Sequence, residues 1–292
     1  MNQPCRACGS IEKSVLLFNV SGNEVVKCTN CSHVFLNNVH TDESLRKMYV
    51  NYAKEKRSFY LDPGQNGEYI GNLDDYLGRI LGLIPSTVSN PRLLDIGSGG
   101  GHLVRRAQKI GFSVEGVEIC LPLADRTRKE LGCVMHTEPL GNLDLPDAHF
   151  DVITMYDLLE HLQDPIGDLK KARSLLKPGG ILFFLTPNDH ALVRCVARML
   201  HRGFGYVRPM KSLYYDHHLS YFTRQSVATL LDKTGFEPIR IITRNQEMSR
   251  LNIKTTVHRL GITFLFFISR YFDSLGGKFI VYARKPHDKP GL

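Results

Sequence analysis

The sequence predicts an α/β fold in which helices cover a largely parallel sheet, and three observations support this prediction. An apolar segment at 92–96 carries Asp95 near its end and runs into a glycine-rich turn, 97–101, and then a helix. A second apolar segment, 114–118, ends in another acid, Glu118. Further along the chain, strand-like and helix-like segments keep alternating, which is typical of a sheet with helices on its faces.

The remaining strands are expected where apolar and β-branched residues lie between turn formers. In chain order, the seven expected strands are 92–96, 114–118, about 133–136, 150–155, 180–186, 239–242 and 278–283. Two helices are expected before the sheet. One is capped by Thr41 and runs through Tyr49, and the other spans 74–84 and ends before Pro85.

The glycine-rich turn predicts a site for a cofactor that carries a nucleoside, at the carboxyl ends of the parallel strands. Glycine is needed at Gly97, Gly99 and Gly101 because the backbone must turn tightly and approach the cofactor without a Cβ in the way. The glycines read G-x-G-G-G rather than the G-x-G-x-x-G of dinucleotide sites, and Asp95 stands two residues before them. An acid at this strand tip suits a cationic ligand better than a pyrophosphate.

Asp95 and the three glycines resemble motif I of the class I S-adenosylmethionine (SAM) methyltransferases. Segments 145–155, 157–162 and 175–184 resemble, in order, the family's fourth strand, the segment after it and the turn into its fifth strand. The resemblance implies a Rossmann-like, seven-stranded sheet. In that sheet the last strand, 278–283, lies antiparallel between the fifth and the sixth.

The resemblance also implies a SAM site at one edge of the sheet. Glu118 is expected to bind both ribose hydroxyls of SAM, and the glycine turn is expected beside the methionine moiety. The full set of expected cofactor-binding residues is Asp95, Gly97, Ser98, Gly99, Gly101, Glu118, Ile119, Leu140, Tyr156 and Asp157.

Methyl transfer from a sulfonium needs mainly an aligned, dehydrated acceptor, and a base only if the acceptor must lose a proton. His161 is the first candidate base, because it follows the fourth strand and an unperturbed histidine titrates at about pH 6.5. It could instead cap a helix or support the cofactor loop. His218 is the second candidate, because it opens a segment that resembles the tail of small-molecule methyltransferases. Tyr156 is expected to line the acceptor side.

A metal site is an alternative role for the same segment. Asp157-x-x-Glu160-His161, joined by His218, resembles the acid-x-x-Glu-His segment of some RNA-end and quinone-ring O-methyltransferases. Carboxylate oxygens and imidazole nitrogens together suit a divalent cation. The first acid is aspartate here, one methylene shorter than the glutamate of that pattern, which makes this the weaker alternative.

Four cysteines near the N-terminus predict a zinc ribbon. Cys5-x-x-Cys8 and Cys28-x-x-Cys31 have the spacing of two knuckles whose thiolates close a tetrahedral, structural zinc site. Disulfides are the alternative, but the polar residues 1–12 and the isolated remaining cysteines favour a reducing cytoplasm. A four-sulfur site does not need the nearby His33, which is therefore expected at the surface.

Three N-terminal segments resemble the head of bacterial methyltransferases that join a zinc ribbon to a SAM domain and recur among enzymes of sugars and other small metabolites. These segments are 5–10, 26–37 and 41–49. The expected domains are a ribbon at 1–40, a helical linker or lid at 41–90 and a methyltransferase domain at 91–292. Insertions that could build the acceptor pocket are expected at about 188–222 and 246–276.

The formal net charge is +8, and basic residues concentrate in two places. One is the stretch 240–292, and the other is a helix with Arg194, Arg198 and Arg202 at i, i+4 spacing. These arginines are expected either on a solvated face or at a site for an anionic partner. The apolar run 264–268 is too short for a membrane span; it is expected in the core or in a dimer interface, or alternatively on a membrane surface.

These observations favour a cytoplasmic SAM-dependent methyltransferase that acts on a small molecule, with a hydroxylated, sugar-like or secondary metabolite as the expected acceptor. A homodimer and an anionic acceptor are both compatible with the apolar and basic patterns. A zinc-ribbon methyltransferase of ribosomal RNA is the alternative. Against it, the ribbon is not strongly basic, and the Asn/Asp-Pro-Pro-Tyr/Phe signature is missing at 155–158. A scaffold that binds protein through the ribbon is a third interpretation.

Overall fold

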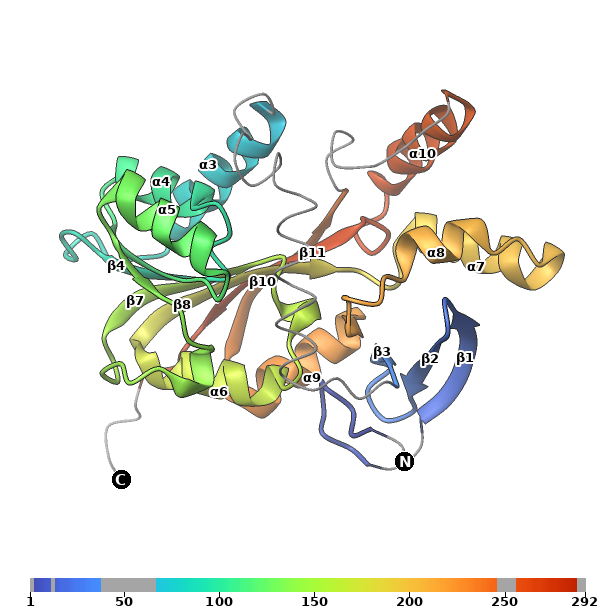
Figure 1. Cartoon of the computed structure of the whole chain (residues 1–292), viewed down its shortest axis with the longest axis horizontal. Helices are drawn as coiled ribbons and strands as arrows, with labels where there is room; N and C mark the ends of the chain where they lie inside the picture. Colours follow the sequence, from blue (N-terminus) through green and yellow to red (C-terminus); the bar gives the residue numbers. More distant parts are fainter. Residues whose placement is uncertain (1–2, 12–13, 38–66, 246–255, 288–292) are drawn as a thin grey trace.

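The computed structural model describes residues 3–11, 14–37, 67–245 and 256–287. Its centre is a seven-stranded sheet with helices on both faces, and a smaller four-stranded sheet lies beside it near the N-terminus (Figure 1). The expected helix from Thr41 to Tyr49 lies outside the described residues.

The large sheet confirms the seven expected strands and their order. Its strands run β10-β11-β8-β7-β4-β5-β6 across the sheet. As expected, β11 lies antiparallel between β8 and β10, whereas β4, β5, β6, β7 and β8 pair in parallel. The bounds are β4 (Arg92–Ile96), β5 (Ser113–Val117), β6 (Val134–His136), β7 (Phe150–Tyr156), β8 (Leu176–Pro187), β10 (Glu237–Arg244) and β11 (Lys278–Arg284).

Two groups of helices cover this sheet (Figure 1). On one face lie α3 (Gly67–Leu81), α4 (His102–Lys109) and α5 (Leu121–Leu131). On the other lie α6 (Pro165–Leu175) and α9 (Arg224–Thr234). The Asp164 side chain caps α6 by accepting from the Gly167 amide, and Thr223 and Ser226 form a capping box that starts α9.

Helix α3 begins at Gly67, earlier than the expected Asp74, and ends at Leu81 rather than at residue 84. The earlier start extends a stripe of buried residues at helical spacing, including Tyr69, Leu73 and Tyr76. The burial of this stripe against the sheet outweighs the weak helix signal of its first turn.

The smaller sheet joins distant parts of the chain. It consists of β1 (Ser14–Val20), β2 (Asn23–Cys28), β3 (Val34–Leu36) and β9 (Ser220–Tyr221), in that order. Strand β3 pairs antiparallel with β9, which comes from the segment 188–222. The N-terminal strands are therefore hydrogen-bonded to a segment that follows the fifth strand of the large sheet.

This pairing overturns the expectation that His33 lies at the surface. The His33 side chain is fully buried, its ring stacks on Phe35 at 5.7 Å and contacts Phe222 at 4.6 Å, and its Nε2 lies 3.3 Å from Ser220 Oγ. Burial lowers the pKa of His33 to about 3, so the ring is neutral. Strand β9 covers His33 from far along the chain, and no local pattern around His33 indicates that contact.

Two of the three helical arginines are also inside rather than on a charged surface. Helix α7 (Leu192–Phe204) buries Arg194, which is 6% exposed. Arg194 donates to the Leu213 carbonyl at 2.7 Å, and its guanidinium lies over the rings of Tyr214 and Tyr221 at 4.9 and 4.8 Å.

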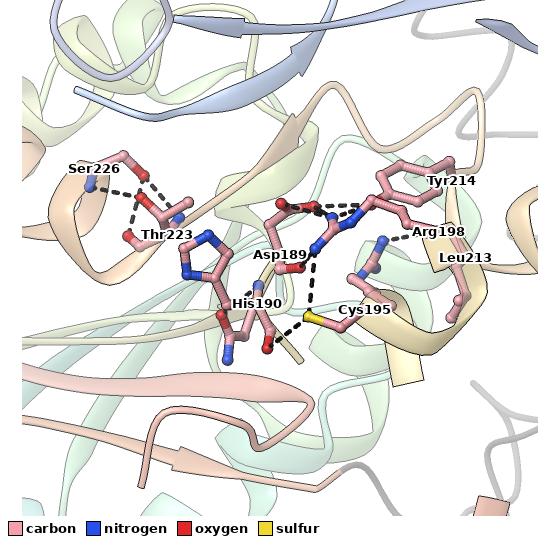
Figure 2. A network of polar contacts seen from close by, with 10 residues as sticks. Asp189, His190, Cys195, Arg198, Leu213, Tyr214, Thr223 and Ser226 are labelled. Carbon is pink, nitrogen blue, oxygen red and sulfur yellow. Dashed lines mark hydrogen bonds and ion pairs between the residues drawn. The ribbon is translucent and has the colours of Figure 1, made fainter. Parts of the chain in front are cut away.

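Arg198 of the same helix forms a second set of hydrogen bonds inside the protein (Figure 2). Its Nη1 donates to both carboxylate oxygens of Asp189 at 3.0 and 2.9 Å and to Tyr214 Oη at 2.8 Å. Asp189 lies before the helix, so helical spacing could not indicate this pair. Arg194 and Arg198 therefore lie neither on a solvated face nor at a site for an anionic partner, so both expectations are wrong for them. Of the three arginines, only Arg202 is exposed.

The segment 188–222 also contains the short helix α8 (Arg208–Leu213), and α10 (Thr256–Ser269) lies between β10 and β11. The expectation that 264–268 packs in the core is wrong, because Phe264 and Phe267 are 62% and 53% exposed. No helix within the described ranges combines the length and the apolarity that crossing a bilayer requires.

Candidate active site

The strand register brings the expected cofactor residues to one edge of the sheet. Ile96 at the end of β4 pairs with Val117 of β5 and with Met155 of β7. Because these strands are parallel, the residues that follow them meet at the carboxyl edge.

Asp95 is a buried carboxyl group at this edge. It is 2% exposed, and its Oδ1 accepts a hydrogen bond from Thr154 Oγ1 at 2.7 Å. Burial raises the pKa of Asp95 to about 7. Ser98 Oγ donates to the Asp95 carbonyl oxygen at 2.7 Å and ties the turn to the end of the strand.

The three expected glycines all have backbone angles in the left-handed region, with φ of 75° at Gly97, 52° at Gly99 and 73° at Gly101. The protein itself also crowds the Cβ position at two of them. A Cβ on Gly101 would lie 2.6 Å from the Thr127 side chain, and a Cβ on Gly97 would lie 3.0 Å from Leu158. Close packing of the protein around the turn is therefore a second reason for these glycines.

Glu118 is the second acid and follows β5. Its two carboxylate oxygens accept hydrogen bonds from the Gly99 amide at 2.7 Å and the Cys120 amide at 2.8 Å. Burial raises the pKa of this carboxyl group. A carboxylate has about four lone-pair positions, so two remain for hydroxyl donors such as those of a ribose.

The other expected cofactor residues lie around the same edge. Ile119 is half-buried directly after Glu118, and Leu140 opens the 3₁₀ turn η2 (Leu140–Asn142) with 5% exposure. Tyr156 ends β7, and its ring contacts Tyr69 of α3 edge-on with the ring centroids 5.9 Å apart.

Asp157 adopts a left-handed backbone conformation with φ of 51°. Both of its carboxylate oxygens accept from Lys278 Nζ, at 2.7 and 2.6 Å. Sequence reasoning missed Lys278. The available signal is a lysine at the start of the otherwise apolar strand 278–283, where it is only 8% exposed.

The two candidate catalytic histidines meet Glu160 in one cluster. One ligand-type atom from each of Glu160, His161 and His218 lies within 4.8 Å of the others, and the two imidazole rings contact edge-on with centroids 4.7 Å apart. Glu160 and His161 belong to the 3₁₀ turn η3 (Leu159–His161), and His218 lies two residues before β9. Asp157 does not join the cluster, because Lys278 holds it.

The hydrogen bonds of this cluster define its protonation. His161 Nδ1 lies 2.7 Å from the His217 carbonyl, which can only accept, so Nδ1 carries the proton and Nε2 keeps a lone pair. Burial lowers the pKa of His161 to about 4 and that of His218 well below its ordinary value. Burial, and secondarily Asp157, raises the pKa of Glu160 to about 8. Near pH 7 the two imidazoles are therefore neutral, and burial favours the protonated form of the Glu160 carboxyl group.

The four expected zinc ligands also come together. The Sγ atoms of Cys5 and Cys31 are 3.5 Å apart, those of Cys8 and Cys28 are 3.7 Å apart, and all four lie within 4.8 Å of one another. In a tetrahedral site with zinc–sulfur bonds of about 2.3 Å, the sulfurs are about 3.8 Å apart, so this arrangement fits zinc. The contact with Cys31 lowers the pKa of Cys5 to about 5, which favours its thiolate.

Comparison with known proteins agrees with this geometry. Residues 68–241 match a family described as methyltransferase domain. Ubiquinone biosynthesis O-methyltransferase of Paraburkholderia phymatum is 34% identical over 130 residues, which cover 40% of this chain and 56% of that protein. The Coxiella burnetii protein of the same name is 36% identical over 107 residues, or 35% of this chain and 46% of the relative. This chain thus spans about half the length of these curated relatives.

Solved structures show the same fold at low sequence identity. A chain of the complex between the Haloferax volcanii Trm112 methyltransferase activator and a methyltransferase has a TM-score of 0.56 and 14% identity, and covers 85% of this chain and 100% of that one. The 1,6-didemethyltoxoflavin-N1-methyltransferase of Burkholderia thailandensis has a TM-score of 0.53 and 16% identity, with 94% and 100% covered.

The sheet order, the two acids and the glycine turn define a class I SAM-dependent methyltransferase. The family match extends over more than half of the chain, so this chain belongs to the family of methyltransferase domains.

Proposed function

We propose that this enzyme transfers the methyl group of SAM to a hydroxyl oxygen of a small molecule in the cytoplasm. The observation that carries the proposal is the neutral His161 with its Nε2 lone pair beside Glu160 and His218, next to the cofactor edge. The names of the curated relatives, which are O-methyltransferases of ubiquinone biosynthesis, support an oxygen of a small molecule as the acceptor.

The cofactor would lie across the ends of β4 and β5. Glu118 would accept from the ribose hydroxyls, and Asp95, once ionised, would favour a cationic ligand near the glycine turn. When bound, SAM supplies a methyl group that its sulfonium has already activated. What this chain must add is alignment of the acceptor and exclusion of water.

His161 would remove the proton from the acceptor hydroxyl. The His217 carbonyl fixes the orientation of the ring, and Nε2 is the only imidazole nitrogen of His161 that can accept a proton. Burial raises the pKa of Glu160 and so favours the neutral form of its carboxyl group beside the His161 ring.

A divalent cation held by Glu160, His161 and His218 is the second candidate, and their convergence within 4.8 Å favours it. Such an ion would lower the pKa of a hydroxyl group bound to it, so the acceptor would lose its proton without the help of a protein base. A chelator distinguishes the two proposals. If turnover survives chelation while zinc stays in the cysteine site, His161 acts as the base; if turnover is lost and magnesium or another divalent ion restores it, the cluster acts as a metal site.

An RNA acceptor receives less support. Arg194 and Arg198, two charges of the expected basic face, are engaged inside the protein and cannot contact phosphates. The acceptor class is tested by transfer of labelled methyl from SAM into a cell lysate separated into RNA, protein and small molecules. Label in the small-molecule fraction supports the proposal, and label in RNA that ribonuclease removes contradicts it.

The cofactor residues are tested by calorimetric titration with SAM. Glu118→Gln should weaken binding roughly tenfold to hundredfold, because hydrogen bonds to a charged acceptor contribute about 1.5–3 kcal/mol. Glu115→Gln is the matched control, since Glu115 lies on β5, just before Glu118, and contacts His136 at 2.8 Å instead. Unchanged affinity in Glu118→Gln would remove Glu118 from the cofactor site.

A further inference from the structure

Helix α10 carries an apolar stripe that faces away from the protein. Leu260, Phe264, Phe267 and Tyr271 recur at i, i+4, i+7 and i+11, which places them on one side of the helix and its last turn. They are 66%, 62%, 53% and 71% exposed, respectively. Scattered single apolar residues are ordinary on a surface, whereas an aligned stripe of this kind marks an interaction site.

The opposite side of α10 is tied to the large sheet, which fixes the direction of the stripe. Asn245, just after β10, donates through Nδ2 to the Phe266 carbonyl at 2.9 Å and to Ser269 Oγ at 2.8 Å. Ser269 is 4% exposed. The helix therefore cannot rotate its stripe inward without breaking these contacts.

Helix α7 also exposes large apolar side chains, although these do not form one aligned stripe. It buries Arg194 and Ala197 against the protein, whereas Met199 and Phe204 are 67% and 83% exposed. Helices α7 and α10 contact each other, and both project from the same end of the large sheet (Figure 1). Together they form one face, the α7–α10 face, with large apolar side chains outside.

Basic residues outnumber acids around this face, although the exposed Asp216 and Asp273 lie at its edges. Residues 192–215 and 256–272 contain no aspartate or glutamate. The exposed basic residues of these two stretches are Arg202, Arg208, Lys211, Arg259 and Arg270. A second copy of the chain docked symmetrically here would bring these cations together, so the charge disfavours self-association.

We propose that the α7–α10 face docks on the surface of an anionic lipid bilayer. Exposed phenylalanine and leucine side chains would enter the boundary between headgroups and acyl chains, while the flanking arginines and lysine would contact lipid phosphates. This proposal concerns a binding surface and does not depend on which acceptor the enzyme methylates.

Sedimentation of the full chain with lipid vesicles tests the proposal. The wild type should pellet with vesicles of mixed phosphatidylglycerol and phosphatidylcholine, and less with phosphatidylcholine alone. Phe264→Ser with Phe267→Ser, and separately Arg259→Glu with Arg270→Glu, should each lower the partition coefficient about tenfold or more, because each apolar group or surface cation contributes on that scale.

Matched changes elsewhere on the surface serve as controls. Leu121→Ser with Val134→Ser removes apolar side chains of similar exposure, 57% and 55%, and Lys109→Glu with Lys129→Glu reverses two exposed charges on α4 and α5. Both control pairs should bind vesicles like the wild type. Circular dichroism and SAM titration establish that every variant is folded.

Three results would overturn the proposal. The first is wild-type protein that stays in the supernatant with anionic vesicles. The second is equal binding to both vesicle compositions, or equal binding by the wild type and the α10 variants. The third is a dimer in sedimentation velocity that Phe264→Ser with Phe267→Ser dissociates, without vesicle binding, which would assign the face to a second copy.

Discussion

Lys278 Nζ donates to both carboxylate oxygens of Asp157, at 2.7 and 2.6 Å, although 121 positions separate the two residues in the sequence. The antiparallel direction of β11 explains the contact, because the first residue of that strand lies where the neighbouring parallel strands end. The inserted strand thus supplies the cation that pairs with an acid at the cofactor edge, and Asp157 contacts this lysine instead of joining the cluster of Glu160 and the two histidines.

Removing Lys278 should destabilise the protein more than removing the whole pair. Lys278→Met leaves the largely buried Asp157 carboxylate without its cation and should lower the free energy of unfolding by about 3–5 kcal/mol. Adding Asp157→Asn should recover part of this loss, because no unpaired charge remains. Urea unfolding of both single variants and the double variant measures the coupling, and strictly additive effects would show that the pair is energetically unimportant.

The pKa of Asp95 predicts how stability without cofactor depends on pH. Because burial raises this pKa from 3.8 to about 7, the folded state retains a proton that the unfolded state loses between these values. The stability that the protonated Asp95 carboxyl group contributes to the folded state is therefore fully present below about pH 4. It is lost as the pH rises through about 7.

Asp95→Asn isolates this contribution, because asparagine is neutral at every pH and has nearly the same shape. Relative to the wild type, the variant should gain up to ~4 kcal/mol in unfolding free energy between about pH 4 and about pH 8. Urea unfolding without SAM, at about pH 4 and about pH 8, measures the difference in unfolding free energy between the variant and the wild type at each pH. If the wild type and the variant differ by the same amount at both pH values, the Asp95 carboxyl group does not titrate as predicted.

The large sheet could be predicted from the sequence because its signals are local. Central parallel strands are buried on both faces and appear as mainly apolar runs, as in 150–156, and the turn at 97–101 needs glycine for its backbone angles. The cysteine quartet is equally local, because each CxxC pair by itself sets two ligands close together.

Three of the errors involve partners distant in the sequence. His33 is covered by β9, a strand of only two residues that has no periodicity to detect. The arginines of α7 look like a surface stripe because Asp189 and Leu213, which satisfy them, lie outside the helix. Asp157 matches a metal-binding pattern in the sequence, but its carboxylate forms an ion pair with Lys278. Spacing along the chain identifies candidate groups and does not identify the charges that compete for them.

The cysteine cluster should hold one zinc ion that stabilises the smaller sheet. Structural zinc in small domains contributes apparent binding free energies of about 10–16 kcal/mol, so losing a ligand should lower the unfolding midpoint sharply. Elemental analysis of protein purified under reducing conditions should find zinc in the wild type and little in Cys28→Ser. Cys195→Ser is the control, because Cys195 is half-buried and lies outside the cluster. A wild type without zinc that unfolds like Cys28→Ser would contradict the assignment.

Gly101→Ala should be harmful for two separable reasons. Its φ of 73° strains any residue with a Cβ, at a cost of roughly 1–2 kcal/mol, and the new methyl group would meet the Thr127 side chain at 2.6 Å. Thr127→Ala in the same chain should relieve the contact but not the strain, so the double variant should recover part of the lost unfolding free energy and remain below Thr127→Ala alone. SAM titration of the double variant then isolates the role of the turn itself. Wild-type affinity would show that Gly101 serves the packing of α4 against α5, whereas weak binding with restored stability would show that the turn needs a bare backbone to approach the cofactor.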